Sequence, residues 1–341
     1  MKKQLLFTLI IAIATTMTMN AQTIALHSST GVQIFKGNTA LASAYTASQS
    51  GDTLYLSGHT FTPPAAFDKQ LMIFGAGHYV DSTLATGKTF INGNVTLSEN
   101  ADLFYIEGVE ITGNYTISTN HAVNNAIIIR CKINGTFNAL GDLSNSTANL
   151  SLIGNVMMGR LNIENIQNSI LSNNILSNTF QGSNGNLINN NIVLGYIYGS
   201  SMDYLFQGNN NTLNNNIFIW EGYNADVNGL GNVFNNNLYV EPAPIYGTSA
   251  TSIGNYTGIL QSAIFVNQTG TVFNYAHDYH LKAPSTYLGT NGSQVGIYGG
   301  TFPYKEGAVP QNPHIQTKNI APTTNVNGDL LIQIQVGAQN E

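Results

Sequence analysis

The densest group of side chains suited to acid–base chemistry lies between residues 107 and 132. Glu107 and Glu110 stand three residues apart, and Arg130 and Lys132 follow about twenty residues later. A polysaccharide lyase needs a cation and a base around an acidic sugar, often with Ca²⁺, and a glycoside hydrolase needs two carboxylates about 5–10 Å apart. These four residues are the catalytic candidates. A structural interpretation competes, because Lys132 occupies the position of Glu110 one repeat later, which predicts a stacked ion pair.

A second group of polar and aromatic residues suits the recognition of sugars. In "GYIYG", Tyr196 and Tyr198 alternate with Ile197 and are expected to point outward. Aromatic rings beside amide and guanidinium groups match the apolar faces and hydroxyl edges of a sugar. The residues predicted to contact a glycan are Arg160, Gln181, Tyr196, Tyr198, Trp220 and Tyr223. The alternative is that these aromatic residues cover strand ends or pack beneath the loop that follows Trp220.

The remaining metal-ligating and nucleophilic side chains are assigned structural roles. His277, Asp278 and His280 lie in "HDYH", where strand alternation puts Asp278 and His280 on one side and Tyr279 on the other. No metal ligands are predicted there, and Ca²⁺ at the acidic cluster is the one cofactor considered. Cys131 is the only cysteine of the sequence, so it cannot form an intramolecular disulfide, and it is expected to be buried.

An internal repeat of roughly 20 residues must position all of these side chains. "INGNVTLS" begins at Ile91, "ITGNYTIS" at Ile111 and "INGTFN" at Ile133. Apolar residues at the same point of later units continue the series, and one extends it backwards: Val156, Ile175, Ile192, Ile217, Leu238 and Ile73. Such a period, without a helical pattern inside the units, is typical of a parallel β-helix whose coils stack about 4.8 Å apart.

Alternation inside each coil separates core positions from surface positions. The columns predicted to point inward are Val95, Tyr115, Phe137 and Leu161, and Leu97, Ile117, Ala139 and Ile163. The residues between them, such as Asn94, Thr96 and Arg160, are predicted to face outward. Tyr115 and Phe137 are accordingly core residues rather than a sugar-stacking stripe.

Asparagine runs mark one turn of each coil in "NLINNNIVL", "NTLNNNIFI" and "NVFNNNLYV". Asparagine tolerates the left-handed backbone conformation, and its amide can bond to the same position one coil away. The predicted ladder consists of Asn174, Asn191, Asn216 and Asn237. An asparagine-lined ligand groove is the alternative.

The composition narrows the class of protein. Only 8% of the 341 residues are charged and 43% are hydrophobic, which does not suit a conventional helical protein. The net charge of −6 offers no basic field, so nucleic acid is not an expected partner. Residues 1–21, with Lys2, Lys3 and an apolar run from Leu5, are typical of a signal peptide. The mature chain is expected to be soluble, secreted or periplasmic, without a membrane span.

The N-terminal part of the repeat resembles a known superfamily. A helix-like pattern from Leu41 to Ala47, "GDTLYL", "LMIFGAGH" and then coils with asparagine turns resemble the pectin-lyase-like right-handed parallel β-helix proteins. Within them the chain is most similar to secreted β-helix repeat proteins of Bacteroidota type. The resemblance implies an all-β, single-stranded, right-handed parallel β-helix with an N-terminal helical cap. No catalytic motif of the superfamily carries over to this chain.

Four segments are predicted: a signal peptide (1–21), an N-terminal segment and cap (22–52), a parallel β-helix whose last coils include "HDYH" (53–300), and a tail with one strand near residues 331–336 (301–341). The expected function is non-enzymatic, extracellular or cell-surface, and either glycan-binding or structural. The alternative is a polysaccharide lyase or glycoside hydrolase. Convergence of the four catalytic candidates in one cleft would favour the enzyme, and their dispersal would favour the scaffold.

Overall fold

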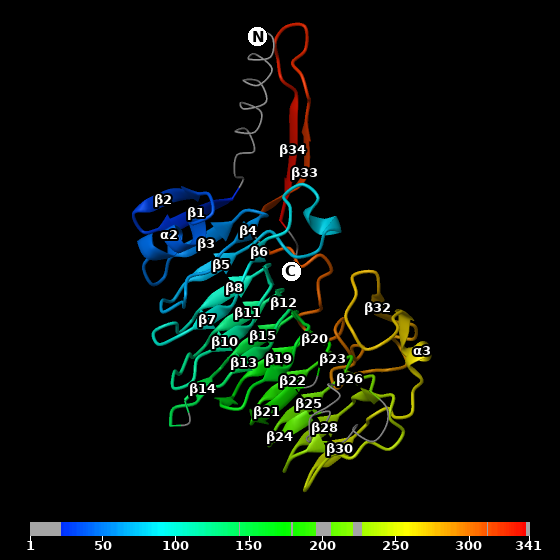
Figure 1. Ribbon diagram of the computed structural model, residues 1–341. Coiled ribbons are helices and arrows are strands. Elements are labelled where there is room, and N and C mark those ends of the chain that lie inside the picture. The colour runs from blue at the N-terminus through cyan, green and yellow to red at the C-terminus, as the bar shows by residue number, and fades with distance from the viewer. Residues whose placement is uncertain are drawn as a thin grey trace, which may run out of the picture.

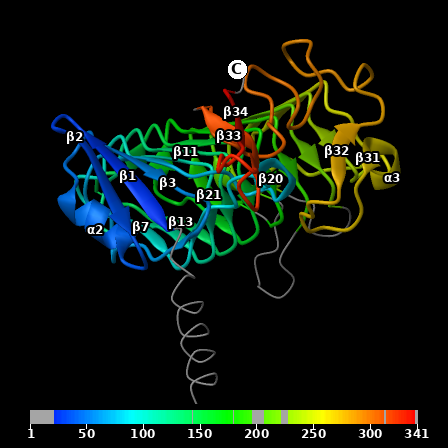
Figure 2. The same ribbon diagram turned by 90° about the horizontal axis from the view of Figure 1, so that it is seen from above.

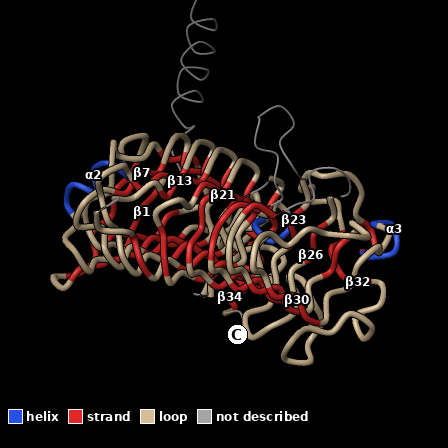
Figure 3. Tube along the Cα trace, turned by 90° about the horizontal axis from the view of Figure 1, so that it is seen from below, coloured by secondary structure: helices blue, strands red, loops and turns tan. Residues whose placement is uncertain are grey.

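The computed structural model describes residues 22–142, 144–178, 180–195, 206–220, 227–311 and 313–338. They form a parallel β-helix with an N-terminal cap and a C-terminal hairpin, which confirms the predicted fold class (Figure 1). Successive coils add strands to three parallel sheets, so equivalent strands stack in rows (Figure 3). The predicted signal peptide lies outside the described residues.

The three sheets are numbered here by the order in which the chain enters them. Sheet 1 contains, in spatial order, β2 (Gly31–Lys36), β1 (Thr23–Ser28), β3 (Thr53–Leu56), β5 (Met72–Phe74), β8 (Tyr105–Glu107), β11 (Ile127–Ile129), β15 (Ser151–Ile153), β19 (Ile170–Ser172), β22 (Leu187–Asn189), β25 (Thr212–Asn214), β28 (Val233–Asn235) and β30 (Thr251–Ile253). Sheet 2 contains β4 (Thr60–Phe61), β6 (Phe90–Ile91), β9 (Glu110–Ile111), β12 (Lys132–Ile133), β16 (Val156–Met157), β20 (Ile175–Leu176), β23 (Ile192–Val193), β26 (Ile217–Phe218) and β29 (Leu238–Tyr239). Sheet 3 contains β7 (Val95–Leu97), β10 (Tyr115–Ile117), β13 (Phe137–Ala139), β17 (Leu161–Asn162), β21 (Phe180–Asn184), β24 (Phe206–Asn209) and β27 (Val227–Asn228), and β14 (Thr147–Ala148) pairs with β18 (Ile166–Gln167) beside it.

A hairpin and a short helix cap the N-terminal end. β1 pairs antiparallel with β2 on one side and with β3 on the other, so the strand edge of the first coil is covered. The helix α2 (Ala40–Ala47) buries Ala40, Leu41 and Ala44, at the place where the sequence predicts a helix. Among the described residues, both α-helices are too short to traverse a bilayer.

The predicted inward columns fill the interior of the coils. Tyr115 and Phe137 are neighbours in register, and their rings stack with centroids 4.9 Å apart and planes inclined by 3°. Their exposed fractions are 0% and 1%, which confirms that they belong to the core. The other six predicted inward residues are buried as well. Stacking at about 4.8 Å gives each of them apolar contacts on the coils above and below.

In the asparagine runs, one residue forms the ladder and the residue before it takes the left-handed conformation. Asn216 forms the predicted ladder: its Oδ1 accepts hydrogen bonds from the backbone N–H and the Nδ2 of Asn191, each at 2.9 Å. Equivalent bonds join the four predicted residues and extend the ladder at both ends: Asn155, Asn174, Asn191, Asn216, Asn237 and Asn255. The preceding residue, Asn215, takes the left-handed conformation with a φ of 59°. Both roles were expected of one asparagine, and the structure assigns them to two neighbouring residues.

Residues 255–311, called the arm here, fold back along the outer face of sheet 2 (Figures 1 and 2). The arm contains α3 (Gln261–Ile264) and the antiparallel strands β31 (Phe265–Asn267) and β32 (Asp278–Leu281). Outward side chains of sheet 2 form a second apolar core with it: Val156, Ile175, Ile192, Ile217 and Leu238 pack with Ile264, Phe265, Phe273, Leu281, Val295 and Ile297. A left-handed asparagine also holds the arm, since Asn173 Nδ2 donates to the carbonyls of Ile297 and Gly299, both at 2.8 Å.

Two features of the C-terminal region differ from the sequence prediction. The parallel coils end at β30 rather than near residue 300, and "HDYH" lies in the arm rather than in a last coil, because the apolar outward column of sheet 2 requires a cover. The predicted strand near the C-terminus is present as β34 (Ile332–Gly337), but it pairs with β33 (His314–Ile320), a strand that was not predicted. This hairpin projects past the capped end (Figure 1).

Candidate functional site

The four catalytic candidates form two ion pairs that lie under different parts of the C-terminal region. Arg130 Nη1 donates to Glu107 Oε1 at 2.6 Å, at the C-terminal ends of the sheet 1 strands β8 and β11. Lys132 Nζ donates to Glu110 Oε1 at 3.1 Å on the outer face of sheet 2, and the two residues are register partners. The stacked Glu110–Lys132 pair is therefore confirmed. The two carboxylates are paired with different cations.

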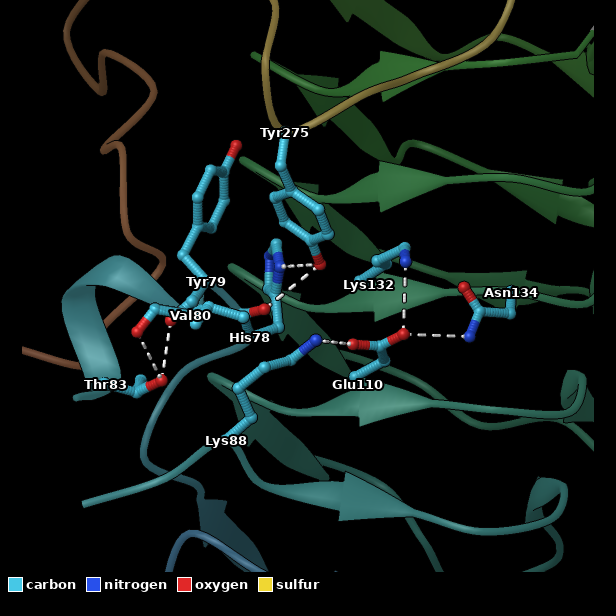
Figure 4. Close-up of polar contacts among 9 residues, drawn as sticks. All are labelled: His78, Tyr79, Val80, Thr83, Lys88, Glu110, Lys132, Asn134 and Tyr275. Carbon is cyan, nitrogen blue, oxygen red and sulfur yellow. Dashed lines mark hydrogen bonds and ion pairs between the residues drawn. The ribbon is translucent and has the colours of Figure 1, made fainter. Parts of the chain in front are cut away.

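The Glu110 cluster lies beside Tyr275 of the arm (Figure 4). Lys88 Nζ lies 2.6 Å from Glu110 Oε2, so this carboxylate has two lysines, and Asn134 Nδ2 donates to Oε1 at 3.0 Å. The ring of Tyr275 covers both lysines, with their ammonium groups 5.3 and 5.0 Å from its centroid. Burial raises the pKa of Glu110, but the hydrogen bonds and charges of its partners outweigh burial and hold the pKa below its usual range. Glu110 is thus a buried, ionised counter-ion.

His78 connects this cluster to the arm. The hydroxyl of Tyr275 donates to the carbonyl oxygen of His78 at 3.1 Å and also lies 3.1 Å from its Nδ1. Because that hydroxyl hydrogen is used on the carbonyl, Nδ1 must carry the proton of the neutral imidazole and donate to the tyrosine oxygen. Burial first, and then the charges of Lys132 and Lys88, lower the pKa of His78 to about 3 against the opposing effect of Glu110. The imidazole is neutral and structural at physiological pH.

The Glu107–Arg130 pair belongs to a different environment. Glu107 is 1% exposed, and its second oxygen accepts a hydrogen bond from the hydroxyl of Tyr105 at 2.6 Å. Burial and the neighbouring Glu107 charge raise the pKa of Tyr105 well above its ordinary value. Both carboxylate oxygens of Glu107 are therefore occupied, and Arg130 keeps further N–H donors beyond the one that it gives to Glu107.

Arg130 stands out by its backbone conformation. One residue after each sheet 1 strand from β8 to β30, the chain takes a positive φ, and those residues are Gly108, Arg130, Gly154, Asn173, Asn190, Asn215, Asn236 and Gly254. Arg130, with a φ of 51°, is the member of this column that is neither glycine nor asparagine. A left-handed non-glycine residue of this kind costs on the order of 1–2 kcal/mol, and such strain is concentrated at functional sites.

Arg130 lines a cavity of about 260 Å³ between the coils and the arm. This arginine pocket is bounded by Ile129, Arg130, Ile153, Gly154, Thr301, Phe302, Pro303, Lys305 and Gln311. Phe302 is 63% exposed, so an aromatic face lies at the edge of the pocket and the buried guanidinium lies in its wall. An apolar ring beside a charged hydrogen-bond donor is the arrangement that recognises a sugar or another flat polar ligand.

A second pocket lies on the same outer face, nearer to the cap. This aromatic pocket has a volume of about 410 Å³, and its floor includes Tyr55 and Phe74, whose rings stack with centroids 5.4 Å apart. Its opposite wall comes from the C-terminal region: Pro310, Pro313, His314, Ile315 and Lys318. Pro310 packs against Gly108, so the chain crosses sheet 1 between the two pockets. The face as a whole presents the stacked rings of Tyr55 and Phe74 at one end and the left-handed Arg130 further along.

The residues predicted to bind a glycan fall into three situations. Arg160 Nη1 donates to Gln181 Oε1 at 3.3 Å, so these two form a polar pair on the outside of sheet 3. Trp220 is partly buried and packs against the main core. Tyr196, Tyr198 and Tyr223 lie outside the described residues.

Sequence reasoning missed both pockets on sheet 1. The aromatic pocket depends on Tyr55 and Phe74, which lie in the quoted motifs "GDTLYL" and "LMIFGAGH" but were not considered as surface residues. The arginine pocket could have been found by aligning the turn column, where Arg130 replaces glycine or asparagine. The walls from the C-terminal region carry no comparable local signal. In comparisons with known proteins, the chain matches no family model, and no curated protein or solved structure is significantly similar to it.

Proposed function

We propose that this chain is an exported, non-enzymatic protein of the pectin-lyase-like superfamily that binds a polysaccharide along the outer face of sheet 1. The signal peptide at residues 1–21 directs it to the periplasm or the cell exterior. The β-helix is the rigid body, and the two pockets are the contact points. The proposed glycan-binding surface is the face that carries Tyr55 and Arg130, rather than the surface around Tyr196 and Tyr198 that was expected from the sequence.

The observation that carries the proposal is the pair of pockets on one face. The stacked rings of Tyr55 and Phe74 line one of them, and Phe302 and Arg130 line the other. Sugar rings bind to aromatic faces through their C–H groups, and their hydroxyl or carboxylate groups accept hydrogen bonds from a guanidinium. One wall of each pocket belongs to sheet 1 and the turns after its strands, which hold Tyr55, Phe74 and Arg130 in place with little loss of entropy on binding.

The state of the carboxylates favours binding over catalysis. Glu107 is buried, with one oxygen engaged by Arg130 and the other by Tyr105. Glu110 is held by two lysines and Asn134 beneath Tyr275. A general acid or base must reach the substrate within hydrogen-bond distance and exchange a proton with it. Two carboxylates fixed in separate ion pairs are better suited to holding coils together.

One observation supports the alternative, a polysaccharide lyase. Arg130 combines backbone strain, a neighbouring carboxylate and a pocket, and strained residues of this kind recur at active sites. In that case the guanidinium would stabilise the negative charge that develops on a uronate.

Affinity gel electrophoresis with a panel of neutral and uronate-containing polysaccharides tests the proposal. The mature chain should be retarded by at least one polysaccharide. Phe302→Ala and Tyr55→Ala should each weaken that retardation about tenfold, which corresponds to roughly 1.4 kcal/mol. Leu260→Ala is the matched control, because Leu260 is a 70% exposed apolar side chain that lines neither pocket. Equal retardation of all three variants and the wild type would refute the proposed surface.

A further inference from the structure

Three potential metal ligands gather where β32 meets the end of the arm. They are Asp278 and His280 on β32 and Glu306 in the turn after Tyr304, and their ligand atoms all lie within 4.8 Å of one another. His280 Nδ1 is 2.8 Å from Asp278 Oδ1 and 3.7 Å from Glu306 Oε1. From these contacts we propose that Asp278, His280 and Glu306 bind one divalent transition-metal ion, Zn²⁺ in the first place.

The spacing of these atoms suits such an ion. Zinc binds histidine nitrogen at about 2.0–2.1 Å and carboxylate oxygen at about 2.0–2.2 Å, so tetrahedral ligand atoms lie about 3.4 Å apart. The two distances from His280 Nδ1 are 2.8 and 3.7 Å, one on either side of that value. The third pair, the carboxylate oxygens of Asp278 and Glu306, lies within 4.8 Å, so rotation of these side chains must bring the two oxygens closer for all three ligand atoms to surround an ion.

The fold fixes both halves of the site. β32 alternates, with Tyr279 and Leu281 buried in the second apolar core, so Asp278 and His280 point together to the other side, as the sequence predicts for these two residues. The half that carries Glu306 is anchored by Tyr304, which is 5% exposed and whose hydroxyl bonds to that of Tyr79 at 2.7 Å. The two halves therefore face each other before any ion arrives.

Surrounding groups orient the ligands as metal sites require. The ring of Tyr298 stacks on the His280 imidazole with centroids 3.9 Å apart, and its hydroxyl donates to Glu306 Oε1 at 2.8 Å. The backbone N–H of His280 donates to Asp278 Oδ1 at 2.9 Å. Partners of this kind hold ligating histidines and carboxylates in position, and their loss typically costs tenfold to a hundredfold in metal affinity.

The donor set determines which ion is expected. One imidazole nitrogen with two carboxylates suits zinc and neighbouring transition metals, whereas Ca²⁺ and Mg²⁺ prefer oxygen ligands throughout. All three side chains are partly exposed, so an ion has access and can keep a water molecule as its fourth ligand. The ion would join β32 to residues 298–306, and Thr301, Phe302, Pro303 and Lys305 of that segment line the arginine pocket. Metal binding would therefore order one wall of that pocket.

Isothermal titration of ZnCl₂ into the EDTA-treated and desalted mature chain tests this site, with CaCl₂ as the comparison. One zinc ion per chain is expected, with much weaker calcium binding. His280→Ala should abolish zinc binding, and Glu306→Gln should weaken it at least tenfold. Glu306→Gln changes an exposed side chain, so it tests the site even if His280→Ala fails to fold.

The matched control is His121→Ala. His121 is also a histidine paired with a carboxylate, since its Nδ1 lies 3.1 Å from Glu99 Oε2, but no second carboxylate joins that pair in the described residues. His121→Ala should bind zinc like the wild type. The site is refuted if the wild type binds no zinc, or if Glu306→Gln binds it as tightly as the wild type does.

Discussion

Replacing Asn216 by alanine should destabilise the protein far more than replacing Asn214, two residues earlier in the same run. The Asn216 side chain is 0% exposed and makes four hydrogen bonds. Its Oδ1 accepts from the backbone N–H and Nδ2 of Asn191, and its Nδ2 donates to the carbonyl of Ile188 and to Asn237 Oδ1. Asn214 is half-buried on the outside of sheet 1 and accepts one bond, from Asn235 Nδ2.

The magnitude follows from the groups that Asn216→Ala leaves without a partner. The backbone N–H of Asn191 loses the oxygen it donates to, and the carbonyl of Ile188 loses the donor from Asn216. An orphaned buried polar group costs about 1–3 kcal/mol, so two of them give a loss of about 4 kcal/mol in the free energy of unfolding. Asn214→Ala leaves no buried backbone group unpaired, and its cost should stay below about 1 kcal/mol.

Urea unfolding of the wild type and both variants, followed by circular dichroism, measures these free energies. Asn215→Gly adds an internal reference, because glycine accepts the left-handed conformation of Asn215 while losing its bonds to the arm at Thr290. The expected order of destabilisation is Asn216→Ala, then Asn215→Gly, then Asn214→Ala. If Asn216→Ala costs no more than Asn214→Ala, the asparagine ladder does not stabilise the fold.

Three further predictions concern buried charges and pH. The pKa of Glu110 is lower in the folded chain than its usual 4.5, so the stabilisation that it gives is present above about pH 4.5 and is lost as the pH falls through the folded pKa. Glu110→Gln should remove this loss of folding free energy in acid, as measured by urea titrations at successive pH values. The pKa of His78 is about 3 in the folded chain and 6.5 in the unfolded chain, so the unfolded chain takes up a proton first as the pH falls. The free energy of unfolding should therefore fall by about 1.4 kcal/mol per pH unit below pH 6.5. His78→Gln should flatten that slope, and an unchanged slope would exclude His78 as its source. Arg130→Asn should cost about 3 kcal/mol because it orphans buried Glu107, and adding Glu107→Gln should restore most of the loss; no recovery in the double variant would show that the pair is not the cause.

The periodic part of the fold could be predicted because its signals are local. Alternation placed Tyr115 and Phe137 in the core, and the repeat aligned Glu110 with Lys132 across one coil step. The later part of the predicted series was one residue out of register, because Val156 pairs with Lys132 rather than with Ile133, and Ile73 lies in sheet 1. The different roles of Asn215 and Asn216 were not predicted, because both residues are asparagine and only the backbone conformation distinguishes them.

The arm and the pockets could not be predicted in the same way. The contact of Asn173 with Ile297 spans 124 residues and follows no period. One signal was present nonetheless: the outward column of sheet 2 changes from Glu110 and Lys132 to Val156 and later apolar residues, and outward apolar positions require a cover. Since walls of both pockets come from the C-terminal region, a site that depends on it was beyond the reach of the repeat pattern.

The most direct test of a non-catalytic, glycan-binding function is to incubate the mature chain with the polysaccharide panel while following unsaturated products by absorbance, reducing ends by colorimetry, and retention in an affinity gel. A non-catalytic glycan-binding protein should be retained by at least one polysaccharide without either product. Product formed by the wild type and lost in Arg130→Asn/Glu107→Gln would contradict this function and establish the arginine pocket as an active site.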